Sequence, residues 1–113
     1  MTISVRQSEG FTILDAKGKI TIGAGDVALR EAIQGALDAG ALKILVNLKN
    51  VSTIDSSGIG ELVSAYTGAT NKGAKLALVH LPPKVQDILQ ITQLVTVFDV
   101  YDDEVAAVAS FAE

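Results

Sequence analysis

Apolar and polar positions along this chain follow two periods, one typical of strands and one typical of helices. Five segments show either strict alternation or the short apolar run of a strand buried on both faces. These segments are residues 3–7, 11–14, 43–48, 75–81 and 97–101. Gly18 interrupts the second segment, and the pattern predicts that residues 19–22 continue it past a bulge. The turn at residues 8–10 predicts that the first two strands form a hairpin.

Helical spacing of apolar residues predicts four helices between and after these strands. We expect them at residues 26–39, at residues 57–72, from Pro82-Pro83 onward and from Asp102-Asp103-Glu104 onward. Asp26 is a candidate N-cap of the first helix, and Gly40 is a candidate stop signal. Residues 49–55 are expected to be a loop. The apolar stripe of the third helix is Val85, Ile88 and Leu89, and that of the fourth is Val105, Val108 and Ala109.

The resulting order is β-β-α-β-α-β-α-β-α. Strands that alternate with helices predict an α/β fold, with a mixed, mostly parallel sheet of about five strands covered by about four helices. A length of 113 residues fits one domain, which we assign to residues 1–113. Because the core uses the apolar stripes of the predicted elements, we expect no large apolar patch on the surface and therefore a monomer when the chain is free.

Composition narrows the possible partners. Nine Lys and Arg against 13 Asp and Glu give a net charge of −4, without a basic run, which argues against nucleic-acid and anionic-membrane partners. The chain has no Cys, so disulfides and thiolate metal sites are excluded. No apolar run approaches the roughly 18–20 residues of a membrane span, and the N-terminus lacks a signal-like apolar stretch. We therefore expect a cytoplasmic protein.

Groups that could carry out catalysis are scarce. His80 is the only histidine, lies within a predicted strand, and has no G-x-S-x-G serine elsewhere in the sequence to pair with. Residues 23–28 match G-x-G-x-x-A, but the next strand ends in Asn47-Leu48 where a dinucleotide fingerprint requires an acid. We therefore expect an ordinary glycine turn, no cofactor, no metal and no enzymatic activity.

The informative segment is Asp55-Ser56-Ser57-Gly58, which precedes a helix, with Gly60 two residues further on. Short polar side chains at this position can simply cap the helix. However, capping requires only one such residue, and glycines in a first turn also allow a close approach by another backbone. A serine hydroxyl at a helix N-terminus is also a suitable phosphoacceptor, because a phosphate there meets unpaired N–H groups. The sequence leaves both interpretations open.

The segment 54–60, together with Val46-Asn47-Leu48 before it and Lys72-Gly73-Ala74 after it, resembles a STAS domain of the anti-sigma factor antagonist type. The resemblance extends through nearly the whole chain. It implies a STAS-type fold and a protein that itself is not an enzyme.

The resemblance also implies a regulatory cycle. The unphosphorylated domain would bind an anti-sigma factor that is a serine kinase and so free the sigma factor. The kinase would phosphorylate Ser56, with Ser57 as second choice, and a metal-dependent serine phosphatase would reset the switch. Asp55, Ser57 and Gly58 would shape the contact with the partner. Thr21 stands where many relatives carry an acid near the phosphoacceptor, so the contact with the kinase is the part of the resemblance that departs from the family.

Two other functional classes remain to be compared. The same fold serves as a non-phosphorylated scaffold subunit of a stressosome or lipid-transport assembly, in which Ser56 and Ser57 only cap the helix. An aspartyl-phosphate receiver would group its carboxylates after the first strand, whereas Asp102 and Asp103 follow the last one. The sequence therefore favours the switch over the scaffold, and both over the receiver.

Overall fold

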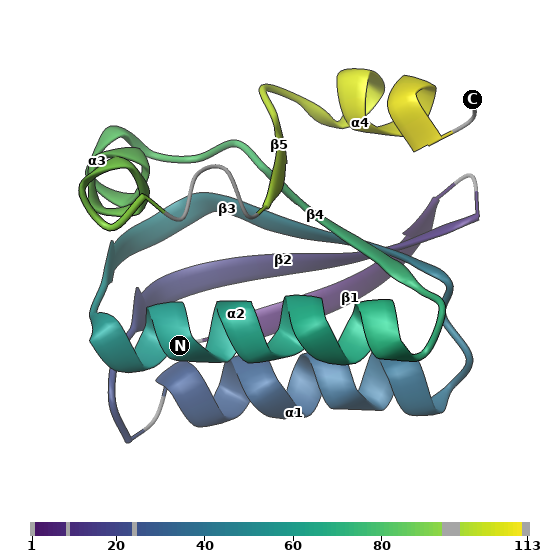
Figure 1. The fold of residues 1–113 in the computed structure, drawn as a ribbon, viewed down its shortest axis with the longest axis horizontal. Helices are drawn as coiled ribbons and strands as arrows, with labels where there is room; N and C mark the ends of the chain where they lie inside the picture. The colour runs from purple at the N-terminus through teal and green to yellow at the C-terminus, as the bar shows by residue number, and fades with distance from the viewer. Residues whose placement is uncertain (1, 9, 24, 94–97, 112–113) are drawn as a thin grey trace.

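A five-stranded sheet with strand order β1-β2-β3-β4-β5 forms the centre of the molecule in a computed structural model, which describes residues 2–8, 10–23, 25–93 and 98–111 (Figure 1). The strands are β1 (Thr2–Ser8), β2 (Phe11–Ile20), β3 (Lys43–Ile54), β4 (Lys75–Val79) and β5 (Asp99–Tyr101). The helices are α1 (Gly25–Asp38), α2 (Ser56–Asn71), α3 (Pro83–Ile91) and α4 (Glu104–Phe111). β1 pairs antiparallel with β2, and all other pairs are parallel. The predicted element order and the mixed, mostly parallel sheet are confirmed.

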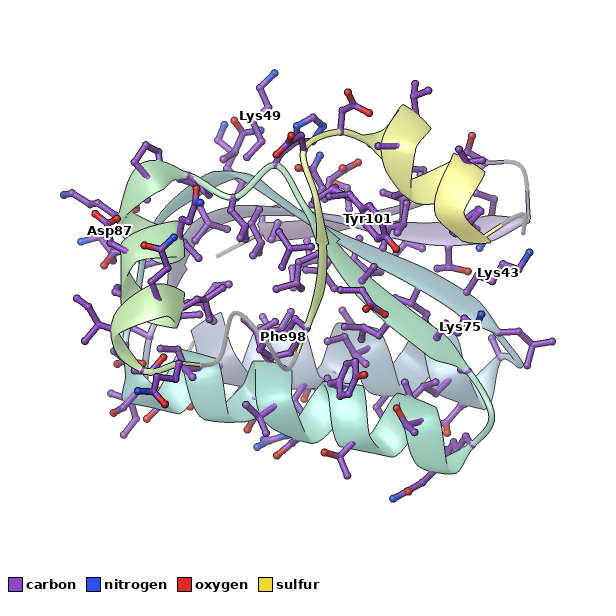
Figure 2. The ribbon with its side chains drawn as sticks, turned by 45° about the horizontal axis from the view of Figure 1, so that its top comes forward. Lys43, Lys49, Lys75, Asp87, Phe98 and Tyr101 are labelled. Carbon is purple, nitrogen blue, oxygen red and sulfur yellow. The ribbon has the colours of Figure 1, made fainter. Side chains whose placement is uncertain are left out.

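The helices lie on both faces of the sheet. α1 and α2 run side by side along one face, and their apolar stripes form the larger core together with the residues of β2, β3 and β4 that face them (Figure 1). Val85 and Leu89 of α3 belong to the same core, as predicted. Phe98 closes this core before β5 (Figure 2). Its ring meets that of Tyr66 edge to face, with 5.6 Å between the ring centroids. α4 covers part of the opposite face through a smaller cluster that includes Phe11 and Ala107.

The expected loop at residues 49–55 is wrong, because β3 continues to Ile54. β2 pairs with β3 along this length through register shifts between Asp15 and Lys17 and between Gly18 and Lys19, so the predicted bulge is confirmed. Past the first shift, the buried residues of β3 are Leu48, Val51 and Ile54, which are three apart instead of two. The bulges therefore break the two-residue alternation by which a strand is recognised, so the second half of β3 could not be predicted from the sequence.

Several element ends also differ from the prediction. β2 stops at Ile20, so Ile22 lies outside the strand and is 74% exposed. β4 stops at Val79, because His80 adopts a left-handed backbone with φ of 56°. α1 begins at Gly25, which places Asp26 inside the first turn. α2 begins at Ser56, one residue earlier than predicted.

The apolar stripe predicted for the last helix is right only for Val108, which packs against the smaller cluster, whereas Ala109 is exposed. Val105 is 79% exposed, whereas Ala107 is completely buried against the sheet. A small side chain at the contact lets α4 lie close to the strands, and the larger valine is left outside. Val97, which was predicted to open the last strand, lies outside the described residues.

Candidate functional site

The candidate site lies where α2 begins, at the carboxyl ends of the parallel strands β2 and β3. β3 ends at Ile54, Asp55 follows, and α2 starts directly afterwards, at the left of Figure 1. The backbone N–H of Asp55 donates to the carbonyl of Ile20 at 3.2 Å. The turn between β2 and α1 is thereby held beside the N-terminus of α2, although the two segments are more than 30 residues apart in sequence.

The carboxylate of Asp55 connects these two segments. Its Oδ1 accepts a hydrogen bond from the backbone N–H of Gly58 at 2.9 Å, so Asp55 is the N-cap of α2. Its Oδ2 accepts from the backbone N–H of Ile22 at 3.0 Å. These hydrogen bonds favour the ionised form and hold the pKa of Asp55 below its ordinary value. Asp55 is therefore a fixed negative charge that fastens the β2–α1 turn to the start of α2.

At Gly58 another part of the backbone approaches α2 closely, as the sequence predicted. That backbone belongs to β2 of the same chain. A Cβ at Gly58 would lie 2.2 Å from the carbonyl oxygen of Ile20 and 2.7 Å from side-chain atoms of Ile20 and Ile54. Gly58 is buried, whereas Gly60 is exposed and a Cβ there would meet nothing within 4 Å. Gly58 thus sets how tightly α2 seats on β2, and only Gly60 leaves open space outward.

The two serines differ in accessibility. Ser56, the first residue of α2, is exposed, and Ser57 is half-buried. Neither hydroxyl has a hydrogen-bond partner among the described residues. Both lie in the first helical turn, where backbone N–H groups lack partners within the helix. Of the two serines, Ser56 is therefore the more exposed.

The turn beside the serines includes a residue that sequence reasoning missed. Thr21 is half-buried, its carbonyl accepts from the N–H of Asp26 at 3.1 Å, and it directly precedes the residue that Asp55 binds. Next to it, Ile22 is held by Asp55 with its apolar side chain in solvent. The alternating pattern counted Ile22 as part of the strand. The available signal was Gly23, whose φ of 101° marks the turn.

The chemistry of the site is that of a hydroxyl and a backbone turn. In the part of the chain that the structure describes, no three His, Cys, Asp or Glu side chains are grouped to hold a metal ion. Arg30 of α1 and Glu61 of α2 pair at 3.2 Å across the two helices. His80 follows β4, and its backbone N–H donates to the backbone carbonyl of Tyr101 at 3.3 Å. The arrangement can present Ser56 to another protein.

No helix among residues 2–8, 10–23, 25–93 and 98–111 has both the length and the apolar character needed to cross a membrane.

Comparisons with known proteins give a consistent result. The family model described as STAS domain matches residues 2–107. The chain is 25% identical over 107 residues to the anti-sigma F factor antagonist of Paenibacillus polymyxa, covering 95% of this chain and 92% of that protein.

Solved structures agree on the fold. The crystal structure of an anti-sigma factor antagonist from Mycobacterium paratuberculosis has a TM-score of 0.85 at 19% identity and covers 99% of this chain and 94% of that one. The structure of the Bacillus cell fate determinant SpoIIAA in the phosphorylated form has a TM-score of 0.72 at 18% identity, covering 96% and 99%. At these identities the likeness shows a shared fold.

Proposed function

Because the chain belongs to the STAS domain family, we propose that it is an anti-sigma factor antagonist switched by phosphorylation of Ser56. In its unphosphorylated form it binds an anti-sigma factor that is also a serine kinase, and it thereby frees the sigma factor. The observation that carries the proposal is the exposed position of Ser56 at the N-terminus of α2, beside a turn fastened by Asp55. The name of the Paenibacillus polymyxa relative supports the same role.

Charge explains how the modification would act. A phosphate on Ser56 adds about −1.5 to −2 charges to a turn that already holds the ionised carboxylate of Asp55. The phosphate would also compete with Asp55 for the N–H groups of the first turn, including that of Gly58. A partner that fits the neutral hydroxyl would then meet a strongly negative turn, which weakens binding.

The remaining site residues have supporting roles in this proposal. Asp55 fixes the turn, Ser57 shapes the first helical turn, and Gly58 keeps α2 close to β2. Thr21 and the exposed side chain of Ile22 complete the partner surface next to Ser56. The greater exposure of Ser56 favours it over Ser57 as the phosphoacceptor.

The rest of the cycle belongs to the partners. The kinase brings ATP and magnesium, and a metal-dependent serine phosphatase removes the phosphate. This chain is then a binding protein without an enzymatic activity or cofactor of its own.

Site mapping by mass spectrometry tests the proposal. Protein isolated from its native cell, before and after phosphatase treatment, is expected to carry a phosphate that maps to Ser56. The matched variants S56A and S57A separate the two serines, because only S56A should abolish the modification. Absence of phosphate under all growth and stress conditions would favour the constitutive scaffold, and co-purifying subunits would then identify its assembly.

A further inference from the structure

β1 is an edge strand that lacks the usual protection against pairing. It is seven residues long, and no strand of the described chain pairs with its outer side. Six of its seven residues are exposed, and it contains no Lys and no Pro. Natural sheets usually protect an edge with such residues, with a bulge, or by keeping the strand short. The opposite edge follows that rule, because β5 has only three residues.

The one charge on β1 is already paired. The guanidinium of Arg6 contacts the carboxylate of Asp15 at 2.5 Å and also pairs with Glu104 of α4. Asp15 accepts a further hydrogen bond from Asn47 at 2.8 Å. Arg6 is therefore held over the α4 face of the sheet by two carboxylates and does little to repel another strand at this edge.

An apolar groove of about 660 Å³ lies beside β1, on the face of the sheet that carries α1. Val5 and Leu42 line it and are 59% and 65% exposed. The α1 side of the groove consists largely of small residues, namely Ala32, Gly35, Ala36 and Ala39. The open edge and the groove thus share one side of the molecule.

We propose that β1 pairs antiparallel with β1 of a second copy of this chain, with Val5 at the two-fold axis. In this register Val5 faces its own counterpart, Ser4 faces Arg6 of the second copy, and no two like charges stand directly opposite. The contact is the same patch on both copies, as a closed two-fold dimer requires.

The helices also fit this arrangement. α1 packs over β1 and β2, so the two α1 helices would stand about two strand spacings apart, roughly 10 Å. That distance is near the wide end of the roughly 8–10 Å over which helices pack directly. Gly35 and Ala39 place no bulky side chain between the two helices. The groove is then filled by the second copy, which buries Val5 and Leu42.

The size of the surface predicts a weak dimer. A standard stable interface buries about 800 Å² on each partner, which would be close to a seventh of this chain's 5922 Å² of accessible surface. One strand edge and one side of α1 offer less than that. We therefore expect dissociation constants of roughly 10 µM to 1 mM, the range of weak interfaces. The expectation of a monomer rested on the apolar stripes of the elements, and the exposed Val5 and Leu42 add apolar surface that those stripes do not include.

Sedimentation velocity over a concentration series tests the dimer. Wild-type protein should change from monomer to dimer between about 10 µM and 1 mM. V5K places two like charges at the two-fold axis and should remain monomeric at every concentration. I91K also adds a lysine, at a site 81% exposed on α3, which packs on β3, and it should associate like wild type.

Nuclear magnetic resonance spectra of the same samples locate the contact and verify the fold of V5K. Concentration-dependent amide shifts should be confined to residues 2–8 and the outer side of α1, and they should vanish in V5K. A wild-type monomer at about 1 mM, or shifts that map elsewhere, would overturn the proposal. Ser56 lies on neither surface, so the outcome is independent of the phosphorylation proposal.

Discussion

Two glycines fix how the helices meet the end of β2. A Cβ at Gly25 of α1 would lie 2.0 Å from the carbonyl oxygen of Lys19, and one at Gly58 of α2 would lie 2.2 Å from that of Ile20. Both helices therefore lie directly against the backbone of Lys19 and Ile20. Because Asp55 also bonds to the following turn, the position of Ser56 depends on this contact.

We predict that G58A is strongly destabilising. The added methyl group meets backbone and packed side chains that cannot move aside easily, so the free energy of unfolding should fall by about 2–4 kcal/mol. The matched variant G60A adds the same group in open space on the same helix and should be neutral or stabilising by up to about 1 kcal/mol. Urea unfolding followed by circular dichroism measures both. Equal effects at the two positions would contradict the close approach.

At the scale of elements, α4 is held by little apolar contact and by one ion-pair group. Of its side chains that the structure describes, only Ala107 is completely buried. Glu104, in the first turn, pairs with Arg6, which also pairs with Asp15 and so joins α4 to β1 and β2. Partly exposed ion pairs of this kind contribute about 0.2–1 kcal/mol and weaken in salt.

We therefore predict that E104Q releases α4 without unfolding the domain. Amide exchange in residues 104–111 should accelerate by roughly two- to fivefold, while the strands retain their protection. High salt should cause a similar acceleration in wild type. D87N removes one carboxylate charge from an exposed position on α3 and serves as the control. If exchange in α4 is the same in E104Q and D87N, the ion pairs do not hold this helix.

The order and type of the elements followed from the sequence, whereas the irregular parts did not. Alternation and helical spacing are local properties, so the hairpin and the apolar stripe of α3 could be predicted. The second half of β3 escaped because its partner β2 is bulged at Gly18. On α4, Val108 was predicted to face inward and does, but Ala107 could not be predicted, because contact with the sheet and not apolar content placed it inside and Val105 outside.

At the scale of the whole molecule, the two proposed surfaces are separate. Ser56 lies at the carboxyl ends of the parallel strands, and the edge of β1 lies along the side of the sheet. The Asp55-Ser56-Ser57-Gly58 segment could be singled out from the sequence because capping residues and glycines are local signals. Its connection to Ile22 could not, because that contact joins two strands' ends through the folded sheet.

The central claim is that a phosphate on Ser56 weakens binding to the anti-sigma factor. Isothermal titration calorimetry of that partner against unphosphorylated and Ser56-phosphorylated chain measures this most directly. S56D is the genetic equivalent, and S64D, which places the same charge at an exposed position further along α2, is its control. We predict that phosphorylation reduces affinity by at least about tenfold, or 1.4 kcal/mol, and that S64D binds like wild type. Equal affinity of the phosphorylated and unphosphorylated chains would contradict the account.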